Sequence, residues 1–230
     1  MKKSVFYFLA LTLSVLMVSC GDDDEPGGGS TTGGGSSSGG SSSNGNHEWV
    51  DLGLTSGTLW ATCNVGATSP YEAGDYFAWG ETVPKQDYSW ASYKWYNTVT
   101  GKMTKYSPYV DNKQELDTSD DAAYVNWGSK WRMPTEAQFN ELRAECTWQW
   151  NGSGYLLTSK KNGKTLILPA ASGRAGGSLY GSGSYGNYWS RTLNTGDSEY
   201  ARYLYFYSGN VYVDNGNRYV GQSVRAVRVS

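Results

Sequence analysis

The stretch WRMPTEAQFNELRAEC, residues 131–146, carries the clearest helix signal in the chain. Thr135 is a natural N-cap, and Gln138 follows it three residues later, as a capping box requires. Apolar side chains then recur at the spacing of one helix face, at Phe139, Leu142 and Cys146. The sequence therefore predicts one main helix over residues 135–145, with this apolar face packed against the main sheet.

Strand signals lie on both sides of this helix. Residues 49–52 and 59–62 flank a turn at 55–57, which predicts a β-hairpin. Acidic residues open the segment 120–127 and suit the N-terminus of a second, short helix. Residues 68–118 form a long, irregular, aromatic-rich stretch. We therefore expect an α+β domain with twisted antiparallel sheets, one main and one short helix, and many loops.

The C-terminal third predicts further β-structure. The expected segments are a strand at 166–171, a Gly/Ser-rich loop at 172–188, a strand at 200–207, a hairpin of 211–213 with 218–220 around Asn215-Gly216, and a closing strand at 223–229. By alternation, Tyr203, Tyr205 and Tyr207 share one face of their strand. The other face is apolar, with Leu204 and Phe206, and is expected to join the core.

The N-terminus has the pattern of a bacterial lipoprotein signal peptide over residues 1–20. Lys2 and Lys3 form a basic start, and the apolar run at 5–18 is too short for a comfortable bilayer span. A small residue then precedes Cys20, so we expect Cys20 to be lipidated and to become the first residue of the mature chain. An ordinary cleaved signal or a short membrane anchor is the alternative.

An acidic and then a flexible segment follow, over residues 21–46. Four consecutive acids at 22–25 resemble the acidic surface-export tag of lipoproteins in Bacteroidota. This resemblance implies a chain lipid-anchored in the outer membrane and facing the cell exterior. Residues 26–46 are almost purely Gly and Ser, which bury too little to offset chain entropy and so predict a tether. As a coil, residues 21–46 span roughly 25–30 Å.

The folded part is predicted to be one domain over residues 47–230. Loss of the signal removes two lysines and changes the formal charge from −2 to −4, which argues against a nucleic-acid partner. Contact with the membrane is expected through the lipid anchor only. All ten tryptophans and all but one of the nineteen tyrosines lie in this domain. Its core must therefore be built largely from aromatic side chains.

Two cysteines remain in the domain, Cys63 and Cys146. In an exported protein this predicts one disulfide between them, with two buried free thiols as the alternative. Neither cysteine has an imidazole base evident in the sequence, because the only histidine is His47 at the edge of the tether. A catalytic cysteine is therefore not expected.

Several short motifs occur in order along the domain. They are VDLGL at 50–54, SGTLWA at 56–61, NVGA at 64–67, GDYFAWGE at 74–81, WRMPT at 131–135, LPAA at 168–171, YWS at 188–190 and SVRAV at 223–227. This series resembles the Fibrobacter succinogenes major paralogous domain family of Bacteroidota lipoproteins, over nearly all of residues 47–230. The resemblance implies a C-type-lectin-like fold, in which the last strand pairs near the first hairpin.

The resemblance extends to formylglycine-generating and sulfatase-modifying enzymes, but their chemistry is not expected here. Those enzymes use cysteines in the C-terminal third, and this chain has none after Cys146. Their iron-dependent relatives need several histidines, and this chain has only His47. We therefore predict no catalytic residue and no cofactor. The enzyme alternative is a cleft that pairs Glu81 with Asp75 or Glu136.

Metal binding is likewise not predicted. The calcium-binding tripeptides of C-type lectins do not occur in the sequence. Oxygen ligands could come from Asp214, Asn215 and Asn217, but this segment also has the composition of a hairpin turn, which we predict instead. Arg132 and Arg225 lie in motifs of the resemblance and are expected to be buried structural arginines.

The C-terminal region has the composition of a recognition surface. Residues 165–230 contain nine Tyr and six Arg but no Lys, and Tyr, Ser, Gly, Asn and Arg are the residues of antibody paratopes. The candidate ligand-binding residues are Tyr185, Asn187, Tyr188, Arg191, Tyr200, Arg202, Tyr203, Tyr205, Tyr207, Tyr212, Arg218 and Tyr219. The alternative is that these tyrosines only pack the outer face of a twisted sheet.

Together these features predict a non-catalytic surface binding module or adhesin that recognises a glycan or a protein. Tyr and Trp planes suit the apolar faces of sugar rings. In a variant of this hypothesis the face is hypervariable, because lectin-fold lipoproteins of this kind resemble targets of diversity-generating retroelements. An enzyme, or a structural subunit of a surface appendage, is the further alternative.

Overall fold

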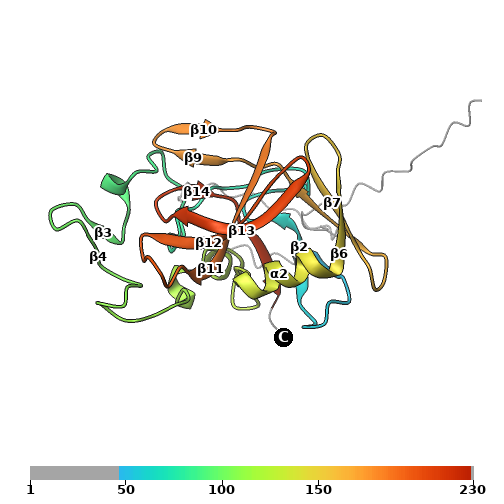
Figure 1. Ribbon diagram of the computed structural model, residues 1–230, viewed down its shortest axis with the longest axis horizontal. Helices are drawn as coiled ribbons and strands as arrows, with labels where there is room; N and C mark the ends of the chain where they lie inside the picture. Colours follow the sequence, from blue (N-terminus) through green and yellow to red (C-terminus); the bar gives the residue numbers. More distant parts are fainter. Residues whose placement is uncertain (1–46, 229–230) are drawn as a thin grey trace, which may run out of the picture.

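The computed structural model describes residues 47–228. The predicted signal peptide, the lipidation site Cys20 and the tether at 21–46 lie outside these residues. The described part is an α+β domain of small antiparallel sheets, two α-helices and long loops (Figure 1). The predicted fold class is confirmed at this level.

Helix α2 spans Glu136–Glu145 and confirms the main predicted helix. The Thr135 side chain accepts a hydrogen bond from the Gln138 backbone N–H at 3.1 Å, and the Gln138 side chain accepts one from the Thr135 N–H at 2.9 Å. This capping box pairs N–H groups that the start of a helix leaves without partners. The apolar face of α2 buries Phe139 and Leu142 in the core.

The short predicted helix is α1, Ala122–Trp127. Its N-cap is Asp121, which accepts hydrogen bonds from the backbone N–H groups of Ala123 and Tyr124. Both carboxylate oxygens of Asp121 also accept from the Met133 N–H at 3.0 Å, and burial raises the pKa of this carboxyl. One buried side chain therefore caps α1 and fixes the chain shortly before α2.

The first and last strands of the domain lie in one sheet, in the order β1-β2-β15-β5. Its strands are β1 (Trp49–Asp51), β2 (Leu59–Asn64), β15 (Arg225–Arg228) and β5 (Trp131–Arg132). β1 and β2 form the predicted hairpin, and β15 pairs antiparallel with both β2 and β5. The closing strand thus brings the two ends of the domain together, as expected.

Three smaller sheets lie in the described residues besides the sheet that bears the candidate site. Their strands are β6 (Cys146–Trp150), β7 (Gly154–Ser159) and β8 (Thr165–Pro169); β9 (Gly173–Ala175), β10 (Ser178–Tyr180) and β14 (Gly221–Gln222); and β3 (Tyr96–Asn97) with β4 (Lys102–Met103). Two short 3-10 turns are η1 (Trp90–Ser92) and η2 (Thr118–Asp120).

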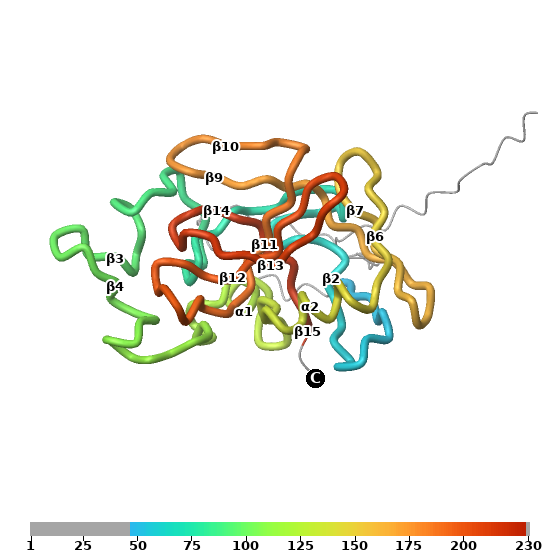
Figure 2. The backbone as a smooth tube through the Cα atoms, viewed as in Figure 1, coloured from blue at the N-terminus to red at the C-terminus, as the bar shows by residue number. Residues whose placement is uncertain are grey.

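The segment at 172–188 is more ordered than its Gly/Ser-rich composition predicted. It contains the hairpin of β9 and β10, which runs along the upper edge of the view in Figure 2. β9 also pairs with β14, where Arg174 lies opposite Gly221. A long-range strand pairing therefore organises a segment that the sequence predicted to be a loop.

The candidate site lies on the sheet of β11 (Tyr185–Leu193), β12 (Tyr200–Tyr207) and β13 (Asn210–Asn217). β12 is the middle strand and pairs antiparallel with both neighbours. Its Leu204 and Phe206 are fully buried, in a cluster that includes Phe139 and Leu142 of α2. The predicted alternation along this strand is confirmed.

The predicted hairpin turn at residues 214–217 is wrong. β13 runs through these residues, and the chain turns instead between Tyr207 and Asn210, which lie opposite each other in the ladder. Gly209 in this turn has a φ of +97°, a conformation that favours glycine. The turn signal of Asn-Gly was therefore overridden by pairing with β12.

Gly216 has a different role from the one that its sequence context suggested. A Cβ atom there would lie 2.9 Å from Gln222 Nε2 and 2.9 Å from Trp189 Cη2. Glycine is therefore required because other side chains approach the β13 backbone closely, and not because the chain turns.

The predicted disulfide between Cys63 and Cys146 is also wrong. Cys146 is a free, buried thiol. It begins β6 directly after α2 and packs in the cluster of Phe139 and Leu142. Cys63 lies near the far end of β2, beside Asn64, which pairs with Arg225 of β15. The two cysteines therefore lie in different parts of the fold.

The core has two main clusters, and both are rich in aromatic rings. One includes Trp60 and Phe139, whose ring centroids are 5.6 Å apart, between α2 and the neighbouring sheets. The other surrounds Trp79, Tyr106 and Trp189. The expectation of an aromatic core is confirmed.

Candidate functional site

Tyrosines from all three strands of the sheet β11-β12-β13 meet on one of its faces. They are Tyr185 of β11, Tyr203, Tyr205 and Tyr207 of β12, and Tyr212 of β13, here called the tyrosine face. Neighbouring rings have centroids between 5.8 and 6.4 Å apart, within the range of aromatic contacts. Tyr205 lies at the centre, because it contacts the other four rings.

Strand alternation and antiparallel register create this face. Directly opposite residues in a ladder point to the same side of a sheet. Tyr185 lies opposite Tyr207, and Tyr205 lies opposite Tyr212. Because the intervening residues of β12 point into the core, the tyrosines are left on the outer side as one continuous aromatic surface.

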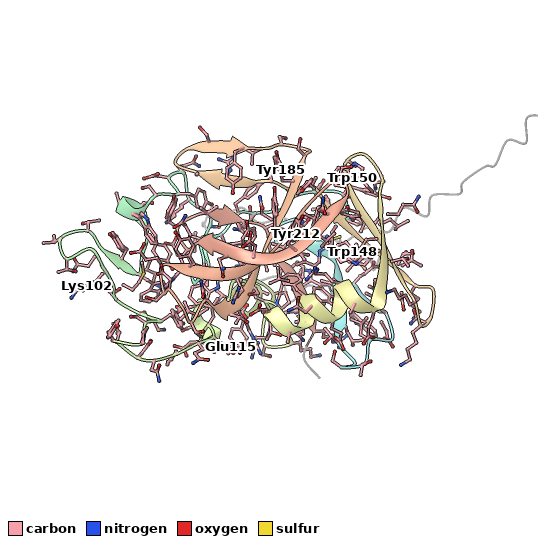
Figure 3. The ribbon with its side chains drawn as sticks, in the orientation of Figure 1. Lys102, Glu115, Trp148, Trp150, Tyr185 and Tyr212 are labelled. Atoms are coloured by element: carbon pink, nitrogen blue, oxygen red, sulfur yellow. The ribbon has the colours of Figure 1, made fainter. Side chains whose placement is uncertain are left out.

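The tyrosine face is open at one end and covered at the other. Tyr212 and Tyr185, both labelled in Figure 3, are 41% and 37% exposed. Tyr203 instead packs against the buried Trp189, with ring centroids 5.8 Å apart. Burial raises the pKa of Tyr203, and the Asp214 carboxylate adds to the rise. A ligand would therefore meet the end formed by Tyr185 and Tyr212 first.

Another tyrosine, Tyr180 of β10, borders this face and was not among the predicted site residues. Partial burial raises its pKa to about 12, and the nearby Tyr219 and Tyr205 add to the rise. Its position depends on the pairing of β10 with β9. No local sequence signal indicates that pairing, and the Gly/Ser-rich composition around Tyr180 predicts a loop.

Two of the predicted residues lie beneath the surface. Asn187 is opposite Tyr205 in the ladder and is only 2% exposed, and its Nδ2 has no hydrogen-bond partner within the described residues. Tyr188 is fully buried, stacks on Phe206 and donates from Oη to the Pro169 carbonyl. Tyr188 is therefore a core residue and is not available to a ligand.

Arg218 was predicted to contact a ligand but is fully buried. Its Nε donates to Tyr93 Oη at 2.9 Å, and its guanidinium lies 4.8 Å from the centre of the Trp79 ring. The Nη groups donate to the carbonyl oxygens of Ser198, Lys105 and Tyr106 at 2.8, 3.1 and 3.2 Å. Arg218 is therefore a structural residue that ties loops together.

The other two predicted arginines form ion pairs away from the tyrosine face. Arg202 alternates with the tyrosines of β12, and its Nε lies 3.4 Å from Glu136 Oε2 of α2. Arg191 Nε lies 3.2 Å from Oε2 of Glu115, which is labelled in Figure 3. The predicted mixture of tyrosine and arginine on one surface is therefore wrong.

The remaining predicted residues, Tyr200 and Tyr219, also lie off this face. Tyr200 is three positions before Tyr203 on β12 and so points to the opposite side. Tyr219 follows β13 and packs against Trp90, with ring centroids 4.8 Å apart. Of the twelve predicted residues, the structure thus brings five together on the surface.

The carboxylates considered for acid–base chemistry have separate surroundings. Glu81 accepts a hydrogen bond from Lys85 Nζ at 2.9 Å, and Glu136 pairs with Arg202. Burial raises the pKa of Asp75. Within the described residues, no three His, Cys, Asp or Glu side chains are grouped in a way that would hold a metal ion.

The two arginines expected to be structural differ in burial. Arg225 is fully buried and donates to Asn64 Oδ1 at 2.8 Å, and burial lowers its pKa to about 10. Arg132 is only half-buried, with its guanidinium 4.1 Å from the centre of the Tyr124 ring. The prediction is therefore confirmed in full for Arg225 alone.

A pocket of about 490 Å³ lies beside β4. Met103, Tyr109 and Glu199 line it, together with Lys102, which is labelled in Figure 3. Its size is within the range of small-molecule sites. None of the predicted site residues lines this pocket, so it is separate from the site that the sequence suggested.

No family model matches the chain, and comparisons with curated proteins and with solved structures found no match. Neither helix within residues 47–228 has the length and apolar character needed to cross a membrane.

Proposed function

We propose that the chain is a non-catalytic binding module or adhesin that recognises a glycan or a protein ligand through the tyrosine face. The observation that carries this proposal is that five tyrosines from three strands form one contiguous outer surface. Tyr185 and Tyr212 keep more than a third of their surface exposed. Tyrosine offers a large contact area at a low cost in side-chain entropy, so an exposed cluster of this kind suits recognition better than packing.

The proposal includes a place for the domain in the cell. The lipoprotein-like sequence at 1–20, with Cys20 as the lipidated residue, and the tether at 26–46 support a domain held outside the outer membrane by its lipid. A tether helps a protein that must reach an immobile ligand. It adds little to catalysis on a diffusing substrate.

We further propose a C-type-lectin-like fold and membership of the Fibrobacter succinogenes major paralogous domain family. The order of the motifs from VDLGL at 50–54 to SVRAV at 223–227 supports this assignment. So does the pairing of the closing strand β15 with β2 of the first hairpin. The start of α2 directly after WRMPT at 131–135 is a further point of agreement.

Binding of the full chain to a glycan and mucin array, with and without calcium, tests the proposed function. Tyr205→Ala and Tyr212→Ala are each expected to weaken binding about tenfold or more, because central aromatic residues carry much of the energy of an interface. Tyr109→Ala is the matched control, because Tyr109 is 96% exposed but belongs to the loop beside the pocket. That variant should bind as the wild type does.

Protein ligands are tested by capture from mucin-rich secretions with the same variants. The fold of each variant is checked by circular dichroism. If both face variants remain folded and still retain every wild-type interaction, the tyrosine face is not the binding surface and the proposal fails.

A hypervariable face is a second candidate, favoured by the separation of the two sides of the sheet. Leu204 and Phe206 carry much of the packing of β12, so exposed outer positions such as Tyr185 and Tyr212 can change without loss of the core. The gene provides the test. AAC-rich codons over residues 180–222 with a near-copy downstream would support this variant, and the lack of any near-copy would end it.

A further inference from the structure

The surroundings of the tyrosine face are poor in positive charge. Every cation that lies over an aromatic ring in the described residues does so on a ring outside this face, as Arg174 does on Tyr76. Arg191 and Arg202 are paired with carboxylates, and Arg218 is buried. These arginines are therefore not placed to receive an anionic ligand.

A carboxylate does lie on the face. Asp214 of β13 is exposed and lies directly opposite Tyr203. It also follows Tyr212 by two positions and so points to the same side of the sheet. Burial and then the neighbouring tyrosines and Asp214 raise the pKa of Tyr205. The Tyr205 phenol therefore stays neutral near neutral pH, and a neutral phenol both donates and accepts hydrogen bonds.

Beside the central Tyr205, on the neighbouring strand β11, lies a buried polar group with an unused donor. Asn187 is opposite Tyr205, is 2% exposed, and has no hydrogen-bond partner for Nδ2 within the described residues. Buried amide groups are normally paired. A neutral acceptor on a ligand, such as a hydroxyl or acetamido oxygen, would satisfy this donor.

From this geometry we infer that the tyrosine face binds an uncharged carbohydrate, a hexose or N-acetylhexosamine, and discriminates against sialylated or sulfated forms of the same glycan. This inference rests on the proposed function and specifies its ligand class. The tyrosine rings match the apolar faces of pyranose rings, and the phenols, Asp214 and Asn187 match hydroxyl and acetamido groups. An acidic sugar would instead meet the Asp214 carboxylate, and like charges across an interface oppose binding.

Matched glycans test the inference, with each neutral oligosaccharide presented beside its sialylated and sulfated derivatives. The full chain is expected to bind the neutral member at least about tenfold more tightly. Asp214→Asn keeps the side-chain oxygen that accepts from the Asn215 N–H at 2.8 Å, and it should reduce this preference at least about threefold. Asp214→Lys should reverse the preference.

Asp197→Asn is the control for charge, because Asp197 is exposed in the turn between β11 and β12. This variant should keep the wild-type preference. Equal or tighter binding of the acidic glycans by the wild type overturns the inference. A preference for neutral glycans that Asp214→Lys leaves unchanged also overturns it.

Tyr205→Ala separates this failure from failure of the proposed function. If acidic glycans are preferred but Tyr205→Ala abolishes their binding, the face still binds a ligand and only the inference fails. If Tyr205→Ala retains full binding, the proposed function fails as well. If the wild type binds no glycan, the inference fails, while a protein ligand that is lost in Tyr205→Ala preserves the proposed function.

Discussion

The buried Arg218 ties loops of this domain together where regular strand pairing is missing. Arg218 donates to Tyr93 Oη, 125 residues away in sequence, and to carbonyl oxygens of two other loops. Backbone groups in buried loops need hydrogen-bond partners as much as those in strands do. The guanidinium group suits this role, because it presents five donors in a fixed planar arrangement.

Arg218→Met tests the structural role of this residue. The substitution keeps an unbranched side chain but leaves buried oxygens without donors, so the free energy of unfolding is expected to fall by about 3–5 kcal/mol. Urea denaturation of the full chain measures the change. Arg143→Met is the control, because Arg143 lies at the end of α2 and bonds to Asn140 on its own helix, and it should cost less than about 0.5 kcal/mol. Equal effects of the two substitutions would contradict the structural role.

Cys146 is expected to react as a free thiol only after the chain unfolds. Its side chain is 2% exposed, and burial raises its pKa to about 11. Little reactive thiolate is therefore present at neutral pH. Iodoacetamide should leave Cys146 unmodified in the native chain and alkylate it in urea without any reductant, as peptide mass spectrometry would show. An unreactive Cys146 in unreduced, unfolded chain would mean that it is bonded after all.

At the scale of elements, the sheet β11-β12-β13 separates packing from surface chemistry. The inner side of β12 contributes fully buried Leu204 and Phe206 to the core beside α2. The outer side carries the tyrosine face. This division depends on close approach between β11 and β12, since Gly186 lies directly opposite Phe206 in the ladder.

Gly186→Ala tests that close approach. A Cβ at this position would lie 2.0 Å from Phe206 Cζ, so the ring or the strand must move, and we expect a loss of about 1–3 kcal/mol in the free energy of unfolding. Gly196→Ala is the control, because its nearest neighbour, Asn194 Oδ1, would be 3.4 Å away. Denaturant unfolding measures both variants.

A second variant shows whether the steric conflict is the cause. Phe206→Leu replaces the ring that the new Cβ of Gly186→Ala would contact with a smaller side chain. The double substitution should therefore lower the free energy of unfolding by less than the sum of the two single ones. If the losses in the free energy of unfolding are strictly additive, the loss in Gly186→Ala does not come from a conflict with the Phe206 ring.

At the scale of the whole molecule, the domain relies on aromatic side chains whose hydroxyl groups are buried as donors. Tyr93 donates to the Trp79 carbonyl at 2.6 Å, and Tyr188 donates to the Pro169 carbonyl. Burial raises the pKa of both phenols. The folded state therefore depends on tyrosines that remain protonated.

This dependence predicts loss of stability in alkali. Because the folded pKa of Tyr93 and Tyr188 exceeds the unfolded value near 10, their contribution is complete below about pH 10 and is lost as the pH rises further. Above about pH 10, each of these two phenols should lower the free energy of unfolding by about 1.4 kcal/mol per pH unit. Arg225 has the opposite effect, because burial lowers its pKa to about 10, but it is one group, whereas burial raises the pKa of several tyrosines.

Urea unfolding between about pH 9 and 11 measures this slope. Tyr188→Phe should reduce the slope by about 1.4 kcal/mol per pH unit, whatever its effect on stability at neutral pH. Tyr109→Phe is the control, because Tyr109 is 96% exposed. If the slope is the same in Tyr188→Phe and the wild type, the buried phenol is not the origin of the alkaline loss.

The sequence by itself determined the elements whose signals are local. Thr135 and Gln138 placed the start of α2, and alternation along β12 identified which residues face the core. The strand and turn pattern of the first hairpin was also predicted. These features depend on residues a few positions apart, so capping and strand alternation are sufficient to predict them.

Only the tertiary structure decided which side chains share a surface. Sequence composition placed Arg202 and Arg218 with the tyrosines, but the partners of these arginines are a helix carboxylate and distant loop oxygens. The same limit applied to the turn expected at 214–217, where pairing with β12 outweighed a local Asn-Gly signal. The free thiol of Cys146 likewise followed from its place in the core. Contacts between residues far apart in the chain have no local pattern, because their free energy is gained only when the whole domain packs.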